Sequence, residues 1–161
     1  MSEIKDLLID EKTVFVFDVD GVLAKLEFGI HNHYEADDDT WNKNCESGIN
    51  LYDEKIVVKK MQEFLTNKDK EKIYVVTKVG TKKEENYKTA YLNKYYKIKS
   101  ENIFYVYDNK EKLSALNKIK NKYIDLDDKY IVFVDDTVDV LTYIMINSNY
   151  STVHISTFLD I

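Results

Sequence analysis

Five short apolar runs, spread along nearly the whole chain, constrain its fold more than any other feature. Each is rich in Val, Ile, Phe or Tyr and is mostly unbroken by polar residues, as in strands that are buried on both faces of a parallel sheet. The runs are Val14–Phe17, Ile73–Val76, Ile103–Tyr107, Ile131–Val134 and Thr152–Ile155. The sequence therefore predicts a central parallel sheet of about five strands.

Between these runs, apolar residues recur at helical spacing, which gives each intervening segment one apolar face. The sets are Val57, Met61, Phe64 and Leu65; Tyr87, Ala90, Tyr91 and Tyr95; Leu113, Leu116 and Ile119; and Val138, Leu141 and Ile144. Strands that alternate with helices indicate an α/β fold with a doubly wound, Rossmann-like sheet. We expect a single domain over residues 1–161, with strand order 3-2-1-4-5.

The composition excludes several classes of protein. With 44% hydrophobic and 32% charged residues, the 161-residue chain is neither a disordered tail nor a membrane protein. No apolar run approaches the roughly 18 residues of a membrane span, and residues 1–10 do not resemble a secretion signal. The one cysteine, Cys45, allows no internal disulfide and no cysteine zinc site, so we expect a cytoplasmic protein.

The charge pattern argues against general nucleic-acid binding. The net charge is −6, and all 23 basic residues are lysines. Phosphate backbones are bound by clustered cations, which an acidic chain without arginine supplies poorly. Pairs such as Lys59–Lys60 and Lys82–Lys83 are expected to be solvated helix faces.

Carboxylates follow two of the apolar runs directly. Asp18 and Asp20 end the first run, and Asp135 and Asp136 end the fourth. In the expected strand order these two strands are neighbours, and their carboxyl ends flank the ligand crevice of an open α/β sheet. One of these acids could instead cap the next helix, but capping explains one acid and not a pair at each strand end.

Four converging carboxylates raise one another's pKa, and a divalent cation removes that conflict. A small set of oxygen ligands favours Mg²⁺, which keeps several waters and binds one or two carboxylates together with a substrate phosphate. The sequence thus predicts a magnesium site formed by Asp18, Asp20, Asp135 and Asp136.

Four segments, in this order, resemble the motifs of the haloacid dehalogenase-like (HAD) phosphohydrolase superfamily. Phe17-Asp18-Val19-Asp20-Gly21-Val22-Leu23 is similar to its first motif, and Val75-Val76-Thr77 to its second. Lys112, near the start of a helix, is similar to the third, and Val134-Asp135-Asp136 to the fourth. The resemblance covers residues 13–155 and implies a phosphatase with few cap residues.

The resemblance implies a role for each acid. Asp18 is the expected nucleophile, which forms an aspartyl-phosphate, and Asp20 is the expected general acid and base. The expected metal ligands are Asp18, the Asp20 backbone carbonyl and Asp136. Asp135 is expected either to bind the metal or to contact its ligands.

The resemblance also implies roles for three other residues. Thr77 is expected to hydrogen-bond a phosphoryl oxygen, and Lys112 to neutralise charge on Asp18 and the phosphoryl group. Gly21 allows a sharp turn after the first strand. With Thr77, it is also an expected binding residue for the substrate phosphate.

Several alternatives remain open in the sequence. Lys110 is an alternative to Lys112 as the lysine of the site. Lys112 is favoured because Leu116, four residues later, gives its helix the same phase as in the family motif. Asp139 is either a further acid at the metal or an N-terminal helix acid. Three other sets are more typical of surface, capping or structural roles: Lys78; Asp37–Asp39; and His31, His33, Cys45 and His154.

Residues 24–50 form an unusually long connection, since loops between strand and helix usually have about 2–6 residues. We expect a small cap or flap there. Its aromatic residues Phe28, Tyr34 and Trp41 could stack on a base or sugar, or pack the segment onto the domain. A small cap leaves a site open to nucleotides or to phosphorylated macromolecules as well as to small phosphate esters.

The leading hypothesis is therefore a Mg²⁺-dependent phosphomonoester hydrolase. A catalytically silent HAD-like binding domain is the alternative. A receiver-type phosphoacceptor module is disfavoured. In that fold the acidic pair ends the first strand, the phosphoacceptor Asp the third and the Lys the fifth. Here the acids end the first and fourth runs, and the fifth run has no lysine.

Overall fold

The computed structural model describes residues 2–25, 37–53 and 56–160. Its centre is a sheet of five parallel strands in the order β3-β2-β1-β4-β5. This confirms the predicted doubly wound, Rossmann-like α/β fold and its strand order. The strands are β1 (Val14–Phe17), β2 (Ile73–Lys78), β3 (Ile103–Val106), β4 (Ile131–Asp135) and β5 (Ser151–His154).

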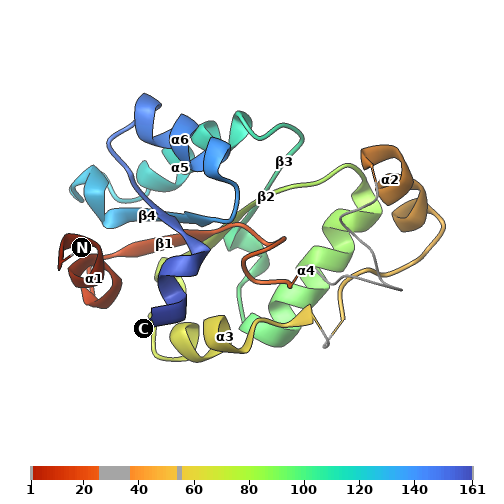
Figure 1. The fold of residues 1–161 in the computed structure, drawn as a ribbon, viewed down its shortest axis with the longest axis horizontal. Coiled ribbons are helices and arrows are strands. Elements are labelled where there is room, and N and C mark those ends of the chain that lie inside the picture. Colours follow the sequence, from red (N-terminus) through yellow and green to blue (C-terminus); the bar gives the residue numbers. More distant parts are fainter. Residues whose placement is uncertain (1, 26–36, 54–55, 161) are drawn as a thin grey trace.

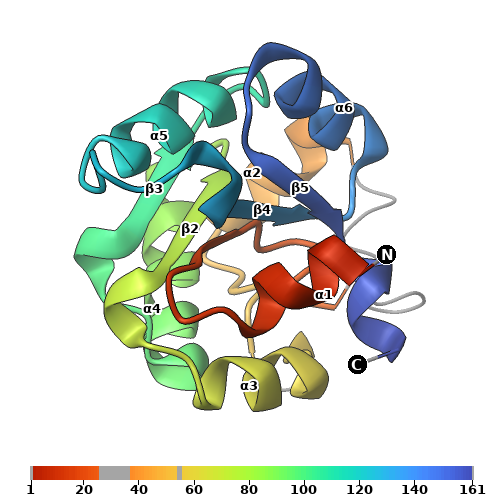
Figure 2. The ribbon, with the colours of Figure 1, turned by 90° about the vertical axis from the view of Figure 1, so that its left-hand side faces the viewer.

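Alternate residues of the strands face two separate cores, which explains the unbroken apolar runs. Phe15 and Phe17 pack against α1 (Ser2–Ile9), α3 (Lys59–Thr66) and α4 (Lys82–Tyr96). Val14 and Val16 face the other core, with α5 (Glu111–Lys120) and α6 (Val138–Asn147). Figures 1 and 2 show these two helical layers on opposite sides of the sheet.

The buried face of α4 differs from the predicted apolar stripe. Ala90, which was expected on that stripe, is exposed, whereas Glu84, Glu85 and Lys88 are buried. The inward face runs from Glu84 through Lys88 to Leu92, at intervals of four residues, so its first two turns are polar. This polar half of α4 faces the carboxyl end of the sheet.

Of the α-helices in the described residues, α1 was not predicted, and α2 was raised only through a possible capping role of Asp37–Asp39. Helix α1 buries Leu7 and Leu8 in the core. Helix α2 (Asp38–Glu46) lies within the predicted insertion and sits beside the start of α4 (Figure 1). No helix of the described part of the chain is both long enough and apolar enough to cross a membrane.

Candidate functional site

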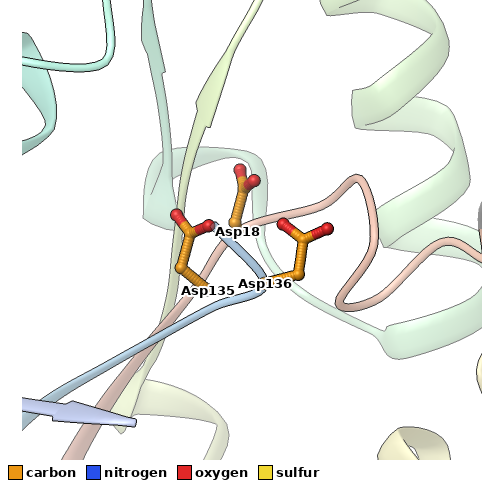
Figure 3. A group of neighbouring side chains, drawn as sticks. All are labelled: Asp18, Asp135 and Asp136. Atoms are coloured by element: carbon orange, nitrogen blue, oxygen red, sulfur yellow. The ribbon is translucent and has the colours of Figure 1, made fainter. Parts of the chain in front are cut away.

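The carboxyl ends of β1 and β4 lie side by side at the centre of the sheet. Phe17 of β1 pairs with Val134 of β4, and the Asp18 backbone N–H donates to the Val134 carbonyl at 2.9 Å. This register brings Asp18, Asp135 and Asp136 together, and one carboxylate oxygen of each lies within 4.8 Å of those of the other two. Figure 3 shows the three side chains at this point.

The three acids are crowded and poorly solvated. Asp135 is fully buried, and Asp18 is 7% exposed. Burial raises the pKa of Asp18 to about 6, with Lys112 opposing the shift and the charge of Asp135 adding to it. Burial and the charge of Asp18 also raise the pKa of Asp136. The cluster therefore favours an added positive charge.

Lys112 supplies one cation. From the first turn of α5 its Nζ lies 2.9 Å from Asp135 Oδ2 and 3.3 Å from Asp18 Oδ2, and the residue is 2% exposed. Burial alone would lower the pKa of Lys112, but Asp18 and Asp135 outweigh it and the pKa is raised. Lys110 is exposed where α5 begins, so Lys112 is the lysine at this cluster.

The acids differ in how completely their oxygens are bonded. Asp135 accepts from Lys112 through Oδ2 and from the Thr137 backbone N–H through Oδ1, at 2.8 Å. Asp136 accepts from the Thr137 hydroxyl at 3.2 Å. Among the described side chains, Asp18 Oδ1 is a buried oxygen with no hydrogen-bond partner. An orphaned buried carboxylate oxygen is costly unless a ligand contacts it.

Gly21 makes room for Asp136. Its φ of +77° places it in the left-handed region, as the predicted sharp turn requires. A Cβ on Gly21 would also lie 2.0 Å from Asp136 Oδ2, so a side chain here would displace that carboxylate. Asp139, in contrast, is exposed in the first turn of α6 and is not part of the acid cluster.

Asp20 does not join the other three acids. Its carboxylate accepts from Lys88 Nζ at 2.8 Å and from the Tyr52 hydroxyl at 3.0 Å. The acid cluster therefore holds three of the four expected carboxylates, and the Asp20 side chain pairs with Lys88 and Tyr52 instead. Asp20 remains near enough for its charge to raise the pKa of Asp18.

Lys88 is the principal residue that the sequence analysis missed. It is fully buried, and its Nζ donates to Thr77 Oγ1 at 3.0 Å. Thr77, also fully buried, is the last residue but one of β2, at the carboxyl end of the strand where it was expected. The only local signal was Glu84 four residues before Lys88, a spacing that is equally typical of exposed ion pairs.

The described part of the insertion packs against the Lys88 side of the site. The Trp41 ring contacts Tyr52 edge-on, with centroids 6.3 Å apart, which supports packing for this aromatic residue. Asp37 caps α2 by accepting from the Thr40 backbone N–H at 2.7 Å, one of its two expected roles. Lys78 forms an ion pair with Asp38 at 2.9 Å.

The remaining aromatic, histidine and cysteine candidates have other outcomes. Phe28, His31, His33 and Tyr34 lie outside the described residues. Burial raises the pKa of the Cys45 thiol to about 11, so this residue stays protonated in the core. His154, at the end of β5, lies 3.0 Å from the Asp136 carbonyl oxygen through Nε2 and packs beside the turn.

The acid cluster fits a hard divalent cation. Its donors are all carboxylate oxygens, Asp18 Oδ1 is unpartnered, and Lys112 pairs with Asp18 and Asp135. Comparison of the chain with models of known protein families, with curated proteins and with solved structures finds no match. Function must therefore be argued from the geometry of these residues.

Proposed function

We propose that this protein is a Mg²⁺-dependent phosphomonoester hydrolase that works through an aspartyl-phosphate on Asp18. The observation that carries the proposal is the unpartnered, buried Oδ1 of Asp18, which lies within a carboxylate cluster and beside a buried lysine. The four motif-like segments, which resemble those of HAD phosphohydrolases, support the same reaction.

In the first step an Asp18 carboxylate oxygen attacks phosphorus, and the ester P–O bond breaks. The departing oxygen takes a proton from Asp20, so the alcohol leaves neutral. In the second step water attacks the phosphorus of the aspartyl-phosphate and gives a proton to Asp20, and the bond to Asp18 breaks. Inorganic phosphate leaves, and both carboxyl groups return to their starting states.

Lys112 and Thr77 are proposed to stabilise charge in this reaction. Lys112 Nζ already contacts Asp18 at 3.3 Å, so its cation lies beside the oxygen that forms the new bond. Thr77 lies near the carboxyl end of β2, the other neighbour of β1, and we propose that its hydroxyl donates to a phosphoryl oxygen. Gly21 keeps the backbone of the β1 turn free of a side chain at the phosphate.

Mg²⁺ is proposed to be held by Asp18 and Asp136, with the Asp20 backbone carbonyl as a third protein ligand. Both Asp135 oxygens already accept hydrogen bonds, which supports a role for Asp135 in orienting Lys112 and the Thr137 turn. When bound, the ion supplies charge neutralisation for the attacking carboxylate and the phosphoryl oxygens.

The proposed substrates are phosphate monoesters, either small molecules such as nucleotides or phosphorylated macromolecules. The test is phosphate release from p-nitrophenyl phosphate with Mg²⁺, extended to phosphorylated metabolites, nucleotides and oligonucleotides with 5′- or 3′-phosphates. Turnover that stops with a chelator and returns with Mg²⁺ supports the proposal. An aspartyl-phosphate that persists for hours would indicate a phosphoacceptor module, and neither turnover nor Mg²⁺ binding would indicate a silent domain.

A further inference from the structure

A second buried lysine, Lys88, lies on α4, across the sheet from the α5 helix that carries Lys112. Lys88 is 0% exposed, and its Nζ has four oxygen acceptors. They are Asp20 Oδ2 at 2.8 Å, Glu84 Oε1 at 3.0 Å, Thr77 Oγ1 at 3.0 Å and the Lys78 carbonyl oxygen at 2.6 Å. An ammonium group has three N–H donors, so Lys88 has no hydrogen bond left for a substrate.

These acceptors come from three separate parts of the chain. Asp20 follows β1, Thr77 and Lys78 end β2, and Glu84 belongs to α4 like Lys88 itself. Two of the four contacts therefore involve proposed functional side chains, Asp20 and Thr77. Lys88 links the proposed general acid and base directly to the proposed phosphate-binding hydroxyl.

The surroundings of Lys88 hold it in one position. Glu84 accepts from the Gly80 backbone N–H at 2.8 Å through its other oxygen, so it is fixed at both ends. The Tyr52 hydroxyl donates to Asp20 Oδ1 at 3.0 Å, and the Tyr52 ring lies 5.7 Å from Lys88 Nζ. A buried charge with so many partners has little freedom to reorient.

We propose that Lys88 is a positioning residue that sets the place of the Asp20 carboxyl group relative to Thr77. Tyr52 is the second residue that holds Asp20. The inference rests on the proposed hydrolase function, and within it Lys88 touches neither substrate nor metal. Its effect on the reaction is transmitted through Asp20, whose proton goes to the leaving oxygen as the ester P–O bond breaks and returns from water in the second step.

The test compares two substrates that differ in their need for that proton. An alkyl phosphate, such as propyl phosphate, needs protonation of its poor leaving group, whereas p-nitrophenolate leaves readily without it. Each variant is characterised by the ratio of kcat/KM for the two substrates. This ratio reports only the steps up to departure of the alcohol, so the common second step does not mask it.

Lys88→Met keeps much of the side-chain length and removes the charge. We expect it to lower kcat/KM for propyl phosphate at least about tenfold more than for p-nitrophenyl phosphate. Tyr52→Phe, which keeps the ring, is expected to shift the ratio in the same direction by a smaller factor. Lys94→Met, an exposed lysine of the same helix, is the matched control and should leave the ratio unchanged.

Thermal unfolding separates positioning from folding. A residue with only a structural role would lower the melting temperature or the active fraction and reduce both activities by the same factor. If Lys88→Met does not fold, Tyr52→Phe decides the question. An unchanged ratio in the folded variant overturns the role of Lys88 while wild-type turnover still supports the hydrolase. No turnover by the wild type contradicts the proposed function itself.

Discussion

Among the described residues, two buried lysines, Lys88 and Lys112, lie in clusters whose carboxylate oxygens are bonded to different extents. In the Lys112 cluster, Lys112 pairs with Asp18 and Asp135, Asp136 lies beside them, and Asp18 Oδ1 has no hydrogen-bond partner. Around Lys88, the oxygens of Asp20 and Glu84 are all bonded to Lys88, Tyr52 or the Gly80 backbone N–H. The first cluster is incomplete and is suited to a ligand, whereas the second is complete within the protein and is suited to holding residues in place.

The largest effect on activity should follow loss of charge in the incomplete cluster. Lys112→Met removes the cation beside Asp18, and we expect phosphatase activity to fall by about 10²–10³-fold. Lys110→Met, two residues away and exposed, is the control in the same steady-state assay. Equal activities for the two variants would contradict the assignment of Lys112.

The complete cluster should respond in stability as well as in the ratio of activities toward the two substrates. Lys88→Met leaves Asp20 and Glu84 without their shared cation, and breaking a buried ion pair typically costs about 3–5 kcal/mol. The double variant Lys88→Met/Glu84→Gln removes one of the stranded charges and should be more stable than the single variant. Urea unfolding followed by circular dichroism measures both, and an unchanged free energy of unfolding for Lys88→Met would show that the network contributes little.

Metal binding should distinguish the clusters without any assay of turnover. Mg²⁺ at about 100 times its dissociation constant should stabilise the folded protein by about 2.7 kcal/mol, because it binds the folded cluster alone. Thermal melts with and without Mg²⁺ measure this gain. Asp136→Asn should weaken it, whereas Glu84→Gln should not; the reverse pattern would place the metal at the Lys88 cluster.

The smallest effect concerns the helix that carries Lys88. The Thr81 side chain accepts from the Glu84 backbone N–H at 3.1 Å and caps the start of α4. Thr81→Ala should therefore lower the free energy of unfolding by about 1 kcal/mol. Thr142→Ala, at an exposed position of α6, is the control and should change it less. A larger loss in the control would contradict the assignment of Thr81 as the cap.

The sequence predicted the incomplete cluster better than the complete one, for a physical reason. Asp18 follows β1 directly and Asp135 and Asp136 lie at the end of β4, so strand order alone brings their backbones together. Lys112 could be preferred to Lys110 because Leu116, four residues later, fixes the phase of the helix. Such patterns are local, and each is fixed within one strand or one helix.

The complete cluster depends on contacts between distant residues. Tyr52 and Asp20 are 32 positions apart, and the direction of the Asp20 side chain follows from that contact and from Lys88. The inward face of α4 begins with the charged residues Glu84 and Lys88, so apolar periodicity does not reveal which residues of this helix are buried. Apolar periodicity missed helix α2 for a similar reason, since Cys45 is its one buried residue.

Replacement of Asp18 tests the central claim most directly. Asn is nearly isosteric with Asp but cannot form the aspartyl-phosphate, and Asp139→Asn provides a control at an exposed acid outside the cluster. With p-nitrophenyl phosphate and Mg²⁺, we predict that Asp18→Asn loses at least about 10³-fold in turnover while Asp139→Asn stays near the wild type. Wild-type turnover by a folded Asp18→Asn variant would contradict the account.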